Sequence, residues 1–290
     1  MRRPARRRPD PEPGAGAGAT SILKFVIAEA SFIAALMFYV GLIYTSRYYS
    51  NFHLSPSSLG FGFSDYVVES LQILSRPVLI AVVSLLLLMS VPQFVRRLPV
   101  TSRVRRRASA VWGAMARQYW VVVAAGLVLF LLWPSVRPYW MAPATVAAGL
   151  LIGQSGAALR GRGQRPADRA VPLFAALAFL LLAVTLLAAQ LGDREAKQAA
   201  ARVVRWPGVV VFSTERLSLT GPPALKAEDL GAGAHLRYRY SGLRLLVQRG
   251  DRYYVVPVGW DRTRDSVYIF RENETTRIEL TPGVRRGARR

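Results

Sequence analysis

The sequence contains no cysteine, only two histidines and only three lysines among its 290 residues. Without cysteine, the chain can form neither disulfides nor thiolate nucleophiles or metal ligands. The histidines, His53 and His235, lie far apart, and no HExxH, GxSxG or phosphate-binding-loop spacing occurs. We therefore find no catalytic constellation, and we expect neither enzymatic activity nor a cofactor or metal site.

Charge is also scarce, and it is unevenly distributed. Only 19% of the residues are charged, against 52% that are hydrophobic, yet the formal net charge is +22. The basic residues gather in joints between apolar runs, where the positive-inside rule expects them in a membrane protein. This placement argues against nucleic acid as a partner, although a high net charge alone could suggest it.

Five apolar runs predict an α-helical membrane bundle over residues 20–192. The most apolar run, 171–192, has no charge and is long enough as a helix to span the ~30 Å hydrocarbon core. The five predicted spans are 25–44, 77–95, 119–133, 139–159 and 171–192. Glycine and proline interrupt the fourth, so the third and fourth could also form a re-entrant hairpin. Gly149 and Gly153 have the small-xxx-small spacing that allows close helix contact.

Arginine clusters predict the orientation in a plasma membrane. Residues 1–19 are an arginine-, proline- and glycine-rich stretch that we interpret as a disordered cytoplasmic tail. The joint after the second span is a candidate contact with an anionic lipid leaflet. Its basic residues include Arg96, Arg97, Arg103, Arg105, Arg106 and Arg107. With the N-terminus cytoplasmic, an odd number of crossings puts the C-terminal part outside the cell.

Glu29 is the one acid inside a predicted span. It lies about a turn or two from the basic end, where a charge costs far less than at the bilayer midplane. We interpret it as an acid that reaches the headgroups or pairs with a basic neighbour. The alternative is an intramembrane functional site, which would make the protein a transporter or channel component.

The segment 47–76 is predicted to lie outside the membrane. Ser64 and Asp65 should begin a short helix, with the acid placed favourably against the N-terminal dipole, and its apolar face should rest on the outer interface. Four tyrosines crowd the end of the first span, as in an aromatic belt. They are Tyr39, Tyr44, Tyr48 and Tyr49.

After the last span, we expect a juxtamembrane helix at 193–206, a small antiparallel all-β domain at 207–282 and a basic tail at 283–290. Short runs of alternating polarity, bounded by turn residues, predict the strands. The runs are 209–213, 216–219, 236–240, 243–248, 253–258, 267–271 and 277–280. Arg249-Gly250-Asp251 lies in a predicted hairpin turn, which we prefer over a cell-adhesion tripeptide.

Two stretches resemble uncharacterised multi-pass membrane proteins of actinobacteria. They read RYYSNFHLSPSSLGFGFSDYVVES and YRYSGLRLLVQRGDRYYVVPVGW. The resemblance implies a Gram-positive plasma membrane and assigns no residue a role. The sequence thus predicts a membrane protein that displays an external β domain for binding, sensing or scaffolding. Its expected partners are membrane lipids and an envelope protein or polymer, with the oligomeric state left open.

Overall fold

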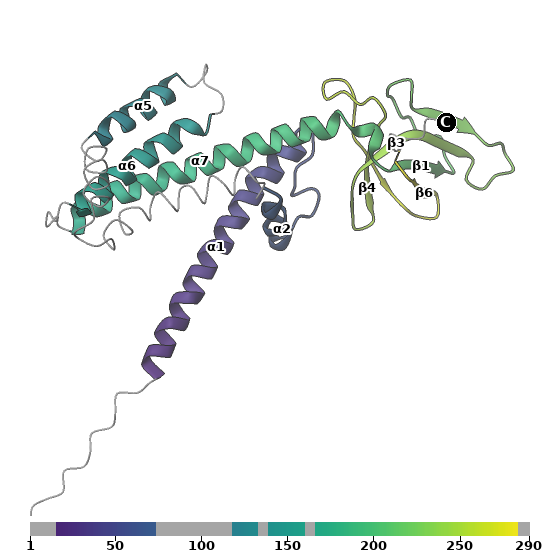
Figure 1. Ribbon diagram of the computed structural model, residues 1–290. Coiled ribbons are helices and arrows are strands. Elements are labelled where there is room, and N and C mark those ends of the chain that lie inside the picture. The colour runs from purple at the N-terminus through teal and green to yellow at the C-terminus, as the bar shows by residue number, and fades with distance from the viewer. Residues whose placement is uncertain (1–15, 74–117, 133–138, 160–165, 284–290) are drawn as a thin grey trace, which may run out of the picture.

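The computed structural model describes residues 16–73, 118–132, 139–159 and 166–283. A helical half is joined to a C-terminal β domain (Figure 1). The two longest helices, α1 (Gly16–Ser50) and α7 (Pro166–Ala200), meet beside the β domain and diverge away from it. Helix α2 (Phe63–Ile73) packs on α1, while α5 (Tyr119–Leu131) and α6 (Met141–Leu159) lie along α7.

The expected five-span membrane bundle is wrong. Among the described residues, only Val26–Ser50 and Ala170–Ala200 are long and apolar enough to cross a bilayer. Helix α5 has 13 residues, so its length of ~20 Å falls short of the ~30 Å hydrocarbon core. The apolar part of α6 is also short, Met141–Gln154. The sequence shows where an apolar run lies but does not show how long its helix is. The predicted span 77–95 lies outside the described residues.

Glycines allow α5 and α6 to approach closely. A Cβ on Gly149 would lie 2.8 Å from Val123 Cγ2, and a Cβ on Gly153 would lie 2.8 Å from Tyr119 Cδ2. Both distances are too short for a larger residue without movement of the neighbouring helix. The small-residue spacing noted in the sequence therefore lies in a helix contact.

The C-terminal parts of α1 and α7 run in the same direction. The hydroxyls of Tyr39 and Thr185 are hydrogen-bonded at 2.9 Å. Further along both helices, a Cβ on Gly192 would lie 2.6 Å from the Tyr44 carbonyl oxygen. Residues further along α1 therefore contact residues further along α7, so the two helices are parallel in this part. Both helices end at the same end of the molecule.

The β domain is a six-stranded antiparallel sheet. Its strands are β1 (Gly208–Ser213), β2 (Lys226–Asp229), β3 (Tyr238–Arg249), β4 (Arg252–Pro257), β5 (Tyr268–Arg271) and β6 (Thr276–Thr281). The order is β5-β4-β3-β1-β6, and β2 also pairs with β3. Tyr240, Val211 and Val255 are buried together in its core. Alternation along β4 turns the next residue, Val256, toward the helices instead.

Two strand predictions differ from the structure in an instructive way. The runs 236–240 and 243–248 contribute to one strand, β3, because Gly242 (φ +87°) bends the chain without ending the pairing. A Cβ there would lie 1.9 Å from the Ala224 carbonyl oxygen. The run 216–219 forms no strand, whereas the fully exposed β2, with the polar sequence KAED, does. Pairing with β3 overrides the poor β propensity of β2.

An aromatic clamp joins the β domain to the helices. The Phe52 ring is fully buried, with its centroid 5.9 Å from that of Trp206 and 5.1 Å from that of Trp260. Asn51 accepts a hydrogen bond from Arg262 at 2.9 Å and donates one to Asp193 at 3.2 Å. The expected helix 193–206 is instead the end of α7, followed by a 3-10 turn, Val203–Arg205, that leads into the clamp.

Candidate functional site

The candidate site lies where α1, α2 and α7 converge, next to the aromatic clamp. Two glycines make the convergence possible. Gly192 brings α7 against α1, and Gly41 brings α2 against α1, since a Cβ on Gly41 would lie 1.9 Å from the Tyr66 carbonyl oxygen. Stacking of Phe38 on Phe63, at a centroid distance of 5.0 Å, fixes the start of α2 on the same face.

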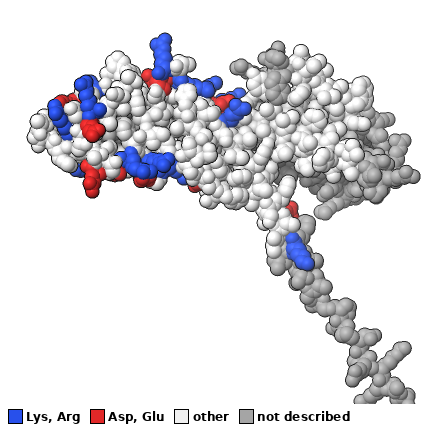
Figure 2. Space-filling view, turned by 180° about the vertical axis from the view of Figure 1, so that it is seen from behind, with Lys and Arg blue, Asp and Glu red and all other residues white. Residues whose placement is uncertain are grey.

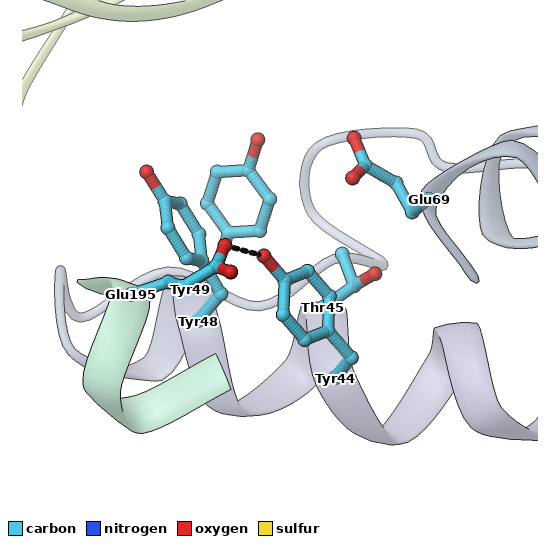
Figure 3. A pocket seen from close by; sticks show the side chains of 6 residues that line it. All are labelled: Tyr44, Thr45, Tyr48, Tyr49, Glu69 and Glu195. Carbon is cyan, nitrogen blue, oxygen red and sulfur yellow. Dashed lines mark hydrogen bonds between the residues drawn. The ribbon is translucent and has the colours of Figure 1, made fainter. Parts of the chain in front are cut away.

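A partly open cavity of about 180 Å³ lies between the three helices. Its lining consists of Tyr44, Thr45, Tyr48, Tyr49, Glu69 and Glu195. Four of these residues follow from the helical period of α1, because positions four apart share a face. Figure 3 shows the tyrosine rings rising from α1, with Glu195 of α7 near the ring of Tyr44 and Glu69 reaching in from α2.

Only some of the polar groups in the cavity are hydrogen-bonded. The Tyr44 hydroxyl donates to a carboxylate oxygen of Glu195, and the Thr45 hydroxyl donates to the Gly41 carbonyl at 2.7 Å. In the part of the chain that the structure describes, the hydroxyls of Tyr48 and Tyr49 have no hydrogen-bond partner. Tyr49 is only 9% exposed and lines the cavity, so its hydroxyl has unused hydrogen-bonding capacity there.

The cavity has an acidic character. Burial raises the pKa of Glu69, and the nearby Asp65 and Glu195 raise it further, whereas Arg249 lowers it. No basic residue lines the cavity. The two carboxylates therefore border the same partly open cavity, where Glu69 is half-buried and Glu195 is exposed.

Arg249 lies beside the cavity, where its guanidinium already contacts Asp65 and Phe61. Its guanidinium lies 3.3 Å from the Asp65 carboxylate and 4.0 Å from the centre of the Phe61 ring. The Gly62 backbone N–H donates to Asp65, which, with Arg249, lowers the pKa of this carboxyl. The β3–β4 hairpin is thus fastened to the start of α2, and the sequence expectation for Asp65 at that helix start is met.

The Arg249-Gly250-Asp251 tripeptide has a structural explanation. Gly250 (φ +57°) makes the hairpin turn, Arg249 binds Asp65, and Asp251 pairs with Arg271 at 2.6 Å. All three residues are accounted for by contacts within the chain, as the turn interpretation predicted.

The other residues singled out in the sequence have the following places in the structure. Glu29 is exposed on α1 and makes no hydrogen bond or ion pair with any described residue. The six candidate lipid-binding arginines between 96 and 107 lie outside the described residues.

Asp261 accepts hydrogen bonds from the backbone and side chain of Thr263, which lower its pKa and identify it as a turn residue. Among the described residues, no three His, Asp or Glu side chains come together as metal ligands.

Sequence reasoning did not find this site. The tyrosines were interpreted as a membrane-interface belt, and Glu69 and Glu195 were assigned to separate solvent-exposed segments. A usable signal was the repeat of tyrosine at positions 44 and 48, which puts two rings on one helix face. The partners of that face depend on long-range packing. Comparison with family models, with curated proteins and with solved structures finds no match.

Stability should depend on pH through Glu69. Its folded pKa lies above the ordinary value of 4.5, so the protonated form favours folding, and this contribution is lost as pH rises through the raised pKa. We expect apparent Tm to fall over this interval in the native protein and to fall less in Glu69→Gln. The groups facing Glu69 are Tyr44 and Tyr49 of α1, Asp65 of α2, Glu195 of α7 and Arg249 of β3.

Thermal unfolding in detergent from about pH 4 to 8 measures this effect, since the interval starts near the ordinary glutamate pKa. Glu274→Gln is the matched control, because Glu274 is exposed in the turn before β6. Identical pH profiles for Glu69→Gln and the native chain would contradict the assignment of the raised pKa to Glu69.

Proposed function

We propose that the protein is an integral plasma-membrane sensor, with a cytoplasmic N-terminus and an external β domain, and that the tyrosine–glutamate cavity is its binding site. The observation that carries this proposal is the convergence of both long apolar helices on the cavity and the β domain. A molecule bound there would touch α1, α2 and α7 at once. Binding could therefore change how the helices pack and how the β domain is held.

The exposed apolar surface of the helices supports membrane insertion. Val26, Ile27, Phe32 and Ile33 of α1 are all more than half exposed, and Phe174 of α7 is 75% exposed. Such a surface is costly in water and is suited to lipid. In Figure 2, charged side chains gather over the β domain and its junction with the helices, while most of the described helical surface is uncharged.

The direction of α1 and α7 supports the proposed orientation. Because both helices run toward the β domain, the arginine-rich segments before them, 1–8 and 160–165, precede the ends remote from that domain. The β domain itself has eleven basic and nine acidic residues between 207 and 283, so most of the +22 charge lies elsewhere. The positive-inside rule then favours a cytoplasmic N-terminus and an external β domain.

The remaining assignments rest on the sequence. We propose a binding role rather than catalysis, with an envelope protein or polymer as a partner of the β domain. The arginines from Arg96 to Arg107 are proposed to contact the anionic inner leaflet.

Cysteine labelling tests the proposed topology, because the native chain contains no cysteine. In intact cells, a membrane-impermeant maleimide should label Glu274→Cys in the β domain, whereas Ala15→Cys should react only after lysis. The unsubstituted chain provides the zero background. Labelling of position 15 and protection of position 274 in intact cells would overturn the proposal.

A further inference from the structure

We propose that the tyrosine–glutamate cavity binds a small organic cation of the substituted-ammonium class, of about the size of tetramethylammonium. This inference rests on the proposed function, because it requires that the cavity serve as a binding site. Three independent properties of the cavity point to this ligand class: its charge, its aromatic lining and its volume.

The charge of the lining selects a cation. Glu69 and Glu195 come from two different helices and face the same cavity, and none of the lining residues is basic. Arg249, whose charge acts on Glu69 and Tyr49, is held outside by Asp65 and Phe61. An anion would be repelled by both carboxylates, and a neutral ligand would leave their charges uncompensated.

The aromatic lining selects an organic cation. Tyr44 and Tyr48 are stacked with centroids 6.3 Å apart, and Tyr48 and Tyr49 meet edge to face at 5.1 Å. The faces of such rings attract substituted ammonium groups, which shed water more easily than metal ions do. The hydroxyl of Tyr49, which has no partner in the described part of the chain, adds an acceptor for a ligand N–H or a bound water.

Calcium and magnesium fit the lining less well. Calcium takes six to eight oxygen ligands and magnesium requires a near-octahedral set. Here Glu195 already accepts the Tyr44 hydroxyl, Thr45 is bonded to its own helix, and three of the six lining residues are tyrosines. The free oxygen ligands of the lining are thus limited to the two carboxylates and the tyrosine hydroxyls.

The volume limits the size of the ligand. The cavity of about 180 Å³ is several times the space that one bound water needs. This lies below the ~300–1,000 Å³ of pockets for drug-sized molecules. A single substituted ammonium group fits within this volume, whereas a larger ligand would extend out of the cavity.

The test uses the full chain purified in detergent and titrated with tetramethylammonium chloride by calorimetry, at constant ionic strength set with sodium chloride. We expect saturable binding. Tyr48→Leu, which removes a ring, and Glu195→Gln, which removes a charge, should each weaken binding by about tenfold. Tyr48→Phe keeps the ring face and should weaken binding less than about threefold, because ring attraction dominates.

Glu279→Gln, at an exposed position of strand β6, is the matched carboxylate control and should bind like the native chain. If Glu195→Gln unfolds, Glu69→Gln tests the second carboxylate without removing the Tyr44 hydrogen bond. The proposal is overturned by the absence of saturable tetramethylammonium binding, by equal affinity in Tyr48→Leu, or by complete displacement with equimolar calcium or potassium. Cysteine labelling reports the topology independently, so failure of this inference and failure of the proposed orientation give different results.

Discussion

Replacing Phe52 with alanine should lower the free energy of unfolding by about 3–5 kcal/mol. Phe52 is fully buried, and its ring contacts both Trp206 and Trp260 in the aromatic clamp. Alanine would leave a cavity between the end of α1 and the β domain that the large indole rings cannot readily fill. The β domain should therefore loosen from the helices as well as lose stability.

Thermal unfolding in detergent and limited trypsin digestion measure the two consequences. We expect a decrease in apparent Tm of roughly 10 °C and faster cleavage at Arg202 and Arg205, which are exposed beside the clamp. Phe32→Ala is the control, because Phe32 is 61% exposed on α1 and packs on little of the described chain. A Phe52→Ala protein that melts and is cleaved like Phe32→Ala would disprove the clamp.

Local sequence patterns predict those parts of the fold that depend on near neighbours. The long apolar runs near 25–44 and 171–192 lie in the two helices long enough to span a bilayer, and most strand runs overlap observed strands. The same reasoning failed for α5, where an apolar run was credited with a crossing although its helix has 13 residues. Hydropathy reports which residues avoid water, whereas a span also needs sufficient helix length.

The candidate site could not be assembled from the sequence because its parts are distant along the chain. Glu69 and Glu195 are separated by more than one hundred residues, and neither has a local pattern that links it to Tyr44. Their meeting depends on Gly41 and Gly192, which resemble ordinary glycines within apolar helices. The absence of a Cβ becomes informative only when the neighbouring helix is known.

The clamp and the cavity are built on consecutive turns of the same helix end. Tyr48 contacts Tyr44 and Tyr49 on the cavity side and Phe52 on the clamp side, at a centroid distance of 5.6 Å from Phe52. A change in the position of Tyr48 must therefore alter both the cavity and the attachment of the β domain. This shared residue gives a short physical route between the cavity and the β domain.

Gly41→Ala should displace α2 and disrupt the cavity. The added Cβ would lie 1.9 Å from the Tyr66 carbonyl oxygen, about 1.5 Å inside the ~3.5 Å separation at which non-bonded atoms attract. A backbone carbonyl cannot move aside as a flexible side chain can, so the whole of α2 must shift and carry Glu69 with it. Overpacking of this kind costs about 1–3 kcal/mol and should lower apparent Tm.

Crosslinking measures the displacement directly in this cysteine-free chain. Phe38→Cys and Phe63→Cys replace two stacked rings whose centroids are 5.0 Å apart, so a short bis-maleimide should join α1 and α2 efficiently. Adding Gly41→Ala should reduce the crosslinked fraction severalfold. Gly62→Ala is the matched control, because a Cβ there meets nothing closer than Asp65 Oδ2 at 3.9 Å. Equal crosslinking in both backgrounds would mean that Gly41 does not set the position of α2, and the cavity would then need another explanation for its shape.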